Sequence, residues 1–327
     1  NDQPVRIYSL LLKCKLEVNK MNKFHKMKFH ILRSISKYAA NNELKSRDYQ
    51  INAIAISEDC SSIFSGSCDG KIRVWDFPTG ECIRVLDGHS NYVCCIVISR
   101  DDSKLVSGSR DWSLRIWEIT TYECIRVLEG HSHSILSVAI SSDDKKIYSG
   151  SSDTTIRIWY FSTGECIRIL KETDHFVYSI AISQDASMII SGYNDRKIRI
   201  WQETTGKCTK ILEGHSDWVV SVKISADNLK IFSGSHDRTI RIWETISGYC
   251  IRILKGHMSD VFSIAISRDA LKIFSGSKDK EIRIWNTMTG ECIKVLEGHS
   301  HTILSIAISA DESMLVSCSL DNTIKFW

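Results

Sequence analysis

The sequence has very little proline and no long apolar segment. Of its 327 residues only Pro4 and Pro78 are prolines, so almost nothing interrupts the hydrogen-bond ladders of a sheet. No apolar run approaches the roughly 18 to 20 residues of a membrane-spanning helix, and no charged start followed by an apolar segment marks a secretory signal. These absences predict an intracellular protein without a membrane span, in the cytoplasm or the nucleus.

Common motifs of nucleotide and metal binding are also missing. The sequence contains neither GxGxxG nor GxxxxGKS/T, and its twelve cysteines show no CxxC spacing, which argues against a structural zinc site. Six cysteines recur at a fixed interval: Cys82, Cys124, Cys166, Cys208, Cys250 and Cys292. Equivalent residues of neighbouring sheets lie about 10 Å apart, too far for a disulfide, so we expect small buried hydrophobes in a reducing compartment. No cofactor is predicted.

What the sequence does contain is one unit repeated seven times at an interval of 42 residues. Seven tryptophans mark the interval: Trp75, Trp117, Trp159, Trp201, Trp243, Trp285 and Trp327. Seven aspartates lie six residues before them: Asp69, Asp111, Asp153, Asp195, Asp237, Asp279 and Asp321. Such a period is typical of stacked units that cannot bury their apolar faces alone. We therefore predict one closed or stacked body over residues 47–327, preceded by an extension of residues 1–46.

Each unit has the pattern of four short strands. In the third unit, residues 135–141, 145–151, 155–159 and 166–170 are rich in β-branched and aromatic residues, and Ser, Asp, Gly and Thr separate them. The first turn carries an aspartate in every unit, as a type I turn favours. The sequence therefore predicts an all-β fold in which each unit is a four-stranded antiparallel meander.

The pattern Gly130-His131, Ser149-Gly150-Ser151, Asp153 and Trp159 resembles the WD-repeat family of β-propellers, and the resemblance covers residues 47–327. It implies a seven-bladed β-propeller of four-stranded antiparallel blades. The Trp-Asp dipeptide itself occurs only at Trp75-Asp76, a departure at a position that varies in this family.

The resemblance also implies that the Trp, Ser, His and Asp of each blade form one hydrogen-bonded set. The histidines of these sets would be His89, His131, His215, His257 and His299. Arg47 and Thr173 stand where the first and the fourth histidine should be, so those two blades are expected to be held less rigidly.

Ser, His and Asp together also make up a hydrolase triad, and the histidines alone could be metal ligands. Because the combination recurs in five units and each buried polar group needs a partner, we interpret these residues as structural and predict neither a metal site nor an enzyme. Arginine recurs in the third and fourth strands as well. We interpret those columns as solvated outer edges whose aliphatic stems cover the strand surface.

The extension of residues 1–46 is basic. It carries ten Lys/Arg against three Asp/Glu, whereas the rest of the chain carries 32 against 36. Apolar residues in the segment 21–38 fall at helical intervals, but Met27, Phe29 and Ile31 alternate as strand residues do. The last repeat stops at its third strand, and in WD-repeat proteins a segment before the first repeat typically completes that blade. We therefore favour a closing strand at about residues 27–35; the competing explanation is that the chain is a fragment.

Positions at which the repeat is broken are the better candidates for recognition. Two tryptophans lie outside the repeated column, Trp112 in a turn and Trp218 three residues after His215. The family arrangement places further aromatic and cationic residues on the same loop rim: Tyr49, Tyr92, Phe176, Arg110, His236 and Lys278. Exposed aromatic residues and arginines are the usual anchors of protein interfaces. The alternative is that these aromatic residues pack locally over the core.

We predict a monomeric, non-catalytic scaffold that binds a protein or peptide on this rim, with Arg110, His236 and Lys278 favouring an acidic or phosphorylated partner. The alternative is a targeting module of a larger multiprotein complex, such as a ubiquitin ligase or a signalling, chromatin or RNA-processing assembly, because a fold does not select among functions. Nucleic-acid binding through the basic arm is the least favoured hypothesis.

Overall fold

The computed structural model describes residues 43–45, 49–77 and 79–327. These residues form 28 strands and no helix, which confirms the predicted all-β fold. Residues 43–77 and 81–327 make up one compact unit. Within the described part of the chain, no helix has the length and apolar composition that crossing a bilayer requires. The segment 27–35 lies outside the described residues, so the choice between helix and strand there stays a prediction.

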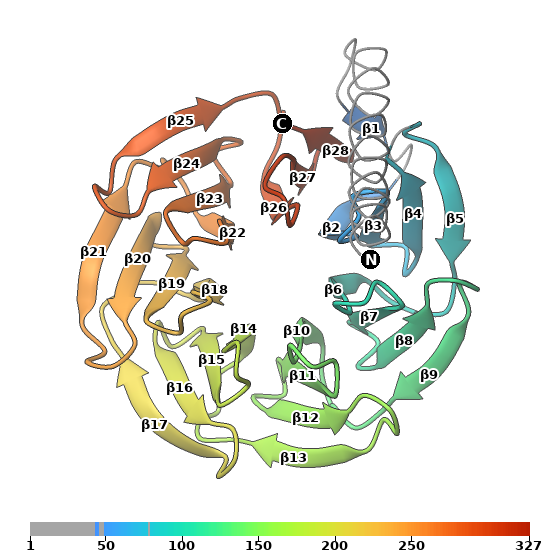
Figure 1. Ribbon diagram of the computed structural model, residues 1–327, viewed down its shortest axis with the longest axis horizontal. Coiled ribbons are helices and arrows are strands. Elements are labelled where there is room, and N and C mark those ends of the chain that lie inside the picture. The colour runs from blue at the N-terminus through green and yellow to red at the C-terminus, as the bar shows by residue number, and fades with distance from the viewer. Residues whose placement is uncertain (1–42, 46–48, 78) are drawn as a thin grey trace, which may run out of the picture. The chain divides into compact units, whose positions relative to one another are not determined.

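Seven four-stranded antiparallel sheets form the compact unit, and each sheet is one blade of a ring (Figure 1). The first strand of a blade lies near the centre of the ring and the fourth lies on its outside (Figure 1). The strands of blades 1 to 3 are β2 (Ile51–Ile56), β3 (Ser62–Ser67), β4 (Ile72–Asp76), β5 (Cys82–Leu86); β6 (Val93–Ile98), β7 (Lys104–Ser109), β8 (Leu114–Glu118), β9 (Cys124–Leu128); and β10 (Ile135–Ile140), β11 (Lys146–Ser151), β12 (Ile156–Tyr160), β13 (Cys166–Leu170).

The other four blades continue the same order. The strands of blades 4 to 6 are β14 (Val177–Ile182), β15 (Met188–Tyr193), β16 (Ile198–Gln202), β17 (Lys207–Leu212); β18 (Val219–Ile224), β19 (Lys230–Ser235), β20 (Thr239–Glu244), β21 (Cys250–Lys255); and β22 (Val261–Ile266), β23 (Lys272–Ser277), β24 (Ile282–Asn286), β25 (Cys292–Leu296). Blade 7 consists of β26 (Ile303–Ile308), β27 (Leu315–Ser319), β28 (Thr323–Phe326) and β1 (Glu43–Lys45).

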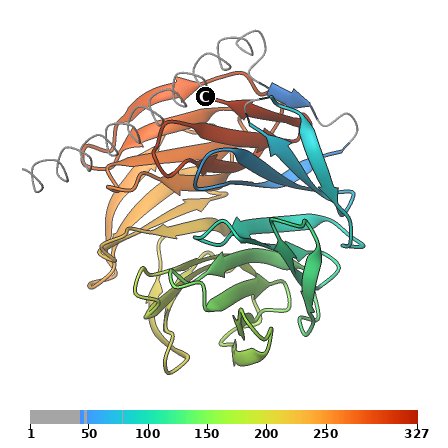
Figure 2. The same cartoon turned by 45° about the vertical axis from the view of Figure 1, so that its right-hand side comes forward.

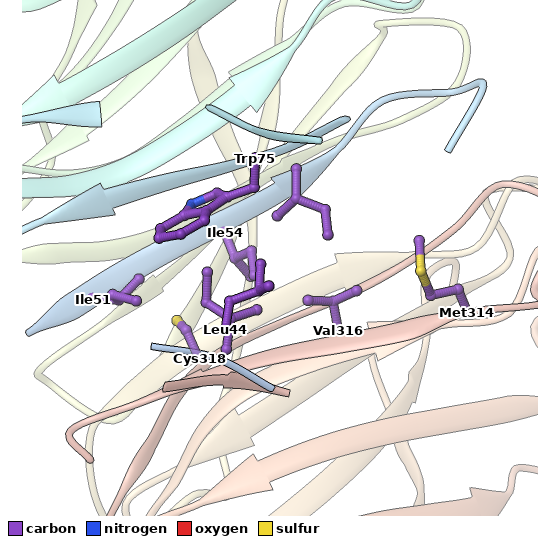
Figure 3. Packing of buried hydrophobic residues seen from close by; sticks show 9 residues of the cluster. Leu44, Ile51, Ile54, Trp75, Met314, Val316 and Cys318 are labelled. Atoms are coloured by element: carbon purple, nitrogen blue, oxygen red, sulfur yellow. The ribbon is translucent and has the colours of Figure 1, made fainter. Parts of the chain in front are cut away.

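Blade 7 joins the two ends of the described chain. β1 pairs antiparallel with β28, and Glu43 forms a 2.7 Å ion pair with Lys325. Leu44 is buried in a cluster that spans blades 7 and 1 and includes Ile51, Ile54, Trp75, Met314, Val316 and Cys318 (Figure 3). The segment that completes blade 7 is therefore Glu43–Lys45, later in the chain than residues 27–35, to which the sequence assigned this place.

Neighbouring blades lie side by side with their faces toward each other (Figure 2). The tryptophan of each blade packs against the sheet before it; Trp201 of blade 4, for example, lies in one cluster with Ile156 and Leu170 of blade 3. Serine side chains add hydrogen bonds between first strands, since Ser137 Oγ accepts the backbone N–H of Ile180 at 3.0 Å. The same bond recurs between the next three pairs of blades.

Aspartates shape the turns at both ends of the second strand. In blade 3, Asp143 accepts the backbone N–H of Lys145 at 3.1 Å, and Asp153 accepts that of Thr155 at 2.9 Å. In this way an aspartate side chain stabilises the turn that follows it. The residue after each aspartate has a positive φ, 74° at Thr154. The repeated aspartates are therefore explained by the turns.

The described cysteines are all free. Those of the repeated column lie at the first or second position of the fourth strands, where Cys82 and Cys292 are exposed and the other four are partly buried. The expectation that they are buried hydrophobes is therefore wrong. The fourth strand is the outer strand of its blade, and no further strand covers it (Figure 1).

Candidate functional site: the loop rim of blades 4 to 6

Five blades contain a hydrogen-bonded chain that runs from the repeated tryptophan to the repeated aspartate. In blade 2, the Trp117 indole N–H donates to Ser107 Oγ at 2.9 Å, the Ser107 hydroxyl donates to His89 Nε2 at 2.8 Å, and His89 Nδ1–H donates to Asp111 at 2.7 Å. Every donor then has an acceptor, provided that the imidazole is neutral. The same chain recurs at 2.6–2.9 Å in the blades of His131, His215, His257 and His299.

Electrostatics favours the neutral imidazole. Burial lowers the pKa of His131 and His215, and their hydrogen bonds to aspartate oppose this only in part. Burial on its own raises the pKa of Asp279, but hydrogen bonds from His257 and from backbone N–H groups outweigh it and bring the pKa to about 2. At neutral pH the sets of His131 and His215 therefore hold a neutral imidazole.

Blades 1 and 4, which lack the histidine, use arginine instead. Arg199 donates from Nη2 to Asp195 at 2.7 Å, and Arg73 donates to Asp69 at 2.6 Å. Both guanidinium side chains are mostly buried, with exposed fractions of 7% and 15%. Trp201 still donates to its serine at 2.8 Å. The expectation that third-strand arginines are solvated edge residues is therefore wrong in these blades, where arginine replaces the imidazole as partner of the aspartate.

In the histidine sets, the side chains that could bind a metal ion or take part in catalysis are hydrogen-bonded to one another. His257, Asp279 and Glu281 come close enough together to hold a metal ion. The two ring nitrogens of His257, however, are occupied by Asp279 and Ser275, and Glu281 pairs with Arg283 at 2.7 Å. Ser275 is fully buried, so a substrate does not reach its hydroxyl. This arrangement serves to hold the blade together.

One rim of the ring is formed by the loop before the first strand and the turn between the second and third strands of each blade. All eight candidate recognition residues lie on these segments. The five aromatic residues have exposed fractions of 38–49%: Tyr49, Tyr92, Trp112, Phe176 and Trp218. Arg110 and Lys278 are exposed, and His236 is half-buried. Since the eight residues belong to different blades, they form several local groups.

In blades 1 to 3 the rim aromatic residues pack against near neighbours. The Arg110 guanidinium lies over the ring of Tyr92, 4.8 Å from its centre, and the Arg73 guanidinium lies 5.1 Å from the ring centre of Tyr49. Trp112 contacts the next blade, where its ring centre lies 5.8 Å from that of His133. These contacts agree with the alternative of local packing for this half of the rim.

A larger group of aromatic side chains crosses blades 4, 5 and 6. Tyr178 stacks on Trp218, with ring centres 5.4 Å apart and 21° between the planes. Trp218 contacts His236 at 5.4 Å, and His236 contacts Phe262 at 5.0 Å. We call these four residues the aromatic row. Because the rings support one another, an apolar group of a partner could pack on exposed Trp218 with little loss of side-chain freedom.

The three cationic candidates are less available than the sequence suggests. Burial lowers the pKa of His236, although Asp260 and Asp217 oppose the shift, so its imidazole is neutral at pH 7. Lys278 lies 3.5 Å from Asp260, and Arg110 belongs to blade 2. None of the three is therefore a free cation beside the aromatic row. The preference for an acidic or phosphorylated partner stays a prediction.

Sequence reasoning missed Tyr178 and Phe262. Both occupy the second position of a first strand, where the other units carry Asn52, Cys94, Leu136, Val220 and Leu304. A signal was present, because these two aromatic residues stand in the units on either side of that of Trp218. An apolar residue in a strand is normally part of the core, however, so the sequence alone does not mark Tyr178 and Phe262 as surface residues.

The opposite rim, formed by the other two turns of each blade, also departs from the repeat. Blades 5 and 6 expose five apolar side chains there by 47–76%: Leu229, Ile246, Tyr249, Leu271 and Met288. Other units carry mainly serine, threonine, glutamate or lysine at these positions. Blades 5 and 6 therefore differ from the repeat on both rims.

The ring of seven four-stranded blades defines the molecule as a seven-bladed β-propeller. The family model "WD domain, G-beta repeat" matches residues 41–76, 80–118, 122–160, 164–202, 206–244, 248–286 and 290–327. The chain therefore belongs to the WD-repeat family, which confirms the resemblance seen in the sequence.

Similar curated proteins match only short stretches. F-box/WD repeat-containing protein 10 of Mus musculus is 32% identical over 69 residues, which is 21% of this chain and 7% of that protein. Pre-mRNA-splicing factor cwf17 of Schizosaccharomyces pombe is 36% identical over 45 residues, 14% of this chain and 13% of that protein. DDB1- and CUL4-associated factor 13 of Danio rerio is 38% identical over 37 residues, 11% of this chain and 8% of that protein.

Proposed function

We propose that the protein is a non-catalytic scaffold that binds a peptide or protein segment on the rim of blades 4 to 6, with Trp218 as the main anchor. The observation that carries this proposal is the aromatic row, which joins three blades and leaves 40% of Trp218 exposed. Short loops on rigid blades lose little conformational entropy on binding. The Ser, His and Asp side chains that a hydrolase would use are occupied by one another, which supports the non-catalytic part of the proposal.

Trp218→Ala tests this function in affinity purification from cell extract. The variant is expected to lose the proteins that the unchanged chain captures, with only a small change in melting temperature, because Trp218 lies in a rim loop and is 40% exposed. Trp112→Ala is the matched control, since Trp112 is exposed by 49% and lies outside the aromatic row. Capture of the same proteins by Trp218→Ala, or their loss only with Trp112→Ala, would contradict the proposal.

A second candidate function is that of a targeting module within a larger assembly. The names of the similar proteins support it, since they mention an F-box, association with DDB1 and CUL4, and pre-mRNA splicing. The matched stretches cover only 7–13% of those proteins. The full reading frame discriminates: an adjoining F-box, kinase or coiled-coil region favours the module over a free-standing scaffold.

We further propose that the protein acts as a monomer inside the cell, in the cytoplasm or the nucleus. One chain supplies all four strands of every blade, which supports the monomer. The free cysteines support a reducing compartment.

A further inference from the structure

The turn between the second and third strands contains a position with unusual backbone geometry. Its φ is positive in every blade, and blade 1 uses Gly70, the residue that adopts this conformation most easily. Blades 4, 5 and 6 place long cationic side chains there, Arg196, Arg238 and Lys280, at φ of 70°, 68° and 76°. We call these three residues the cation arc. Each adopts a backbone conformation that is unfavourable for its type, so the turn itself does not account for the side chain.

The fold does not require charge at this position. Blades 1, 2, 3 and 7 fill it with Gly70, Trp112, Thr154 and Asn322, all uncharged. The cation arc is confined to the three blades that also carry the aromatic row. Two separate departures from the repeat, one aromatic and one cationic, therefore fall on the same part of the rim.

The members of the cation arc are exposed, and within the described residues none of them forms an ion pair. The cations around them are paired: Lys197 with Glu213 at 2.6 Å, and Lys278 with Asp260 at 3.5 Å. Arg199 and Arg283, three residues after Arg196 and Lys280, are paired as well. Arg241, the equivalent residue of blade 5, is half-buried and lies over the Trp243 ring. The cation arc is therefore the charge that this part of the rim has available for a partner.

The carboxylates beside the cation arc face inward. Asp195, Asp237 and Asp279 directly precede its members, but their side chains are only 4–9% exposed and bind Arg199, His215 and His257. On the loops before the first strands, Asp174 pairs with Lys171 at 2.9 Å and Asp260 pairs with Lys278 at 3.5 Å. Asp217 has no ion pair among the described residues, and its carboxylate accepts the backbone N–H of Trp218 at 2.8 Å. Next to the aromatic row, the three cations of the cation arc therefore outnumber this one unpaired carboxylate, and this part of the rim has an excess of positive charge.

We propose that the rim of blades 4 to 6 selects a partner segment that carries carboxylate or phosphate groups, which pair with Arg196, Arg238 and Lys280 while an adjoining apolar side chain packs on Trp218. This inference rests on the proposed function and adds the chemistry of the partner. It also moves the charge preference from Arg110, His236 and Lys278 to three other residues. Arginine suits this role because its planar fork matches the oxygens of carboxylates and phosphates.

The test uses the whole chain, immobilised, and three pools of fluorescent twelve-residue peptides that are random except for a central triplet of phosphoserine, glutamate or lysine. The unchanged protein is expected to retain the phosphoserine and glutamate pools at least tenfold better than the lysine pool. Retention should fall as salt rises, because the contacts are ionic and exposed. Equal retention of the three pools by the unchanged protein would overturn the inference.

Arg196→Gly, Arg238→Gly and Lys280→Gly are combined in one variant. It is expected to fold, because Gly70 shows that the turn accepts glycine, and to lose the tenfold preference for the anionic pools. Thr154→Gly is the matched control, since it makes the same backbone change in blade 3 and removes no charge; it should keep the preference. A triple variant that retains the phosphoserine pool as well as the unchanged protein would overturn the inference.

Trp218→Ala separates this inference from the proposed function. If Trp218→Ala lowers retention of all pools and the triple variant removes only the anionic preference, both proposals are supported. If Trp218→Ala changes nothing while the triple variant still loses the preference, the proposed anchor fails and the cation arc stands. A single-stranded oligonucleotide that binds more tightly than the phosphoserine pool, through the same three residues, would overturn the peptide as partner.

Discussion

Blades 5 and 4 solve the same problem in different ways. Each has a turn aspartate whose buried carboxylate needs a partner. Blade 5 supplies His215, which bridges Asp237 and Ser233. Blade 4 has Thr173 at that position and turns Arg199 toward Asp195 instead. The comparison teaches that the requirement of the fold is a donor for the carboxylate, and that the identity of the donor is open.

Substitution of the repeated tryptophan tests whether blades 4 and 5 are packed equally well. It should give the largest change in the free energy of unfolding. Trp243 and Trp201 are 1% and 2% exposed and donate to their serines at the same distance, 2.8 Å. Trp243→Ala and Trp201→Ala are each expected to lower the free energy of unfolding by about 3–5 kcal/mol, because each leaves a large cavity between blades. Urea unfolding measures both. A loss in blade 4 of less than half that in blade 5 would show that arginine leaves its blade more loosely packed.

Substitution of the third-strand arginine should affect the stability of blade 4 more than that of blade 5. Arg199→Leu is expected to destabilise the protein by about 3 kcal/mol, since it leaves the carboxylate of Asp195 buried without its cation. Arg241→Leu, the same change in blade 5, should cost less than about 1 kcal/mol, because Asp237 keeps His215. The Arg241 guanidinium lies over the Trp243 ring, and its Nε has no hydrogen-bond partner among the described residues. Equal losses from the two substitutions would refute the proposed difference.

The smallest expected effect concerns the pH dependence of the free energy of unfolding, to which histidines contribute and arginines do not. In the folded protein the pKa of His131 and of His215 is lowered from its ordinary value, because burial disfavours the charged ring. As the pH falls below 6.5, the unfolded chain therefore binds more protons than the folded one, and the free energy of unfolding decreases. Arginine, which takes the place of histidine in blades 1 and 4, generally stays protonated in this range.

Unfolding in urea at pH 7.5 and pH 5.5 checks this sign. The unchanged protein should be less stable at pH 5.5, and the double variant His131→Gln, His215→Gln should lose less stability between the two pH values. A double variant with the same loss as the unchanged protein would show that the two histidines are not responsible. Trp201→Ala, which leaves both histidines in place, is the control that should keep the full pH dependence.

Much of the fold could be predicted because the repeat shows it seven times. A column such as Trp159 or Asp153 has one role in every copy, so a pattern seen once is checked by six others. The closing strand could not be found in this way. Glu43–Lys45 contains a single apolar residue, Leu44, and a segment of three residues is too short to show a periodic pattern. The strand forms because β28 has a free edge and because residues of blade 1 cover Leu44.

The candidate site was predictable only in outline. Trp218 stood out because it lies outside the repeated column, but Tyr178 and Phe262 resembled ordinary strand residues. Arg110, His236 and Lys278 appeared to be the available cations. Their neighbours in space, which the sequence does not show, occupy or neutralise them, whereas Arg196, Arg238 and Lys280 remain unpaired within the described residues.

The sequence by itself determined the number of blades, their strands and turns, and the tryptophan and aspartate that each blade repeats. These features depend on local periodicity and on turn chemistry, which act over a few residues. Only the tertiary structure decided which strand completes blade 7, which side chain satisfies each buried aspartate, and which aromatic rings meet on the rim. The reason is physical: pairing, burial and charge neutralisation depend on groups that lie far apart in the chain and meet only when the ring of blades closes.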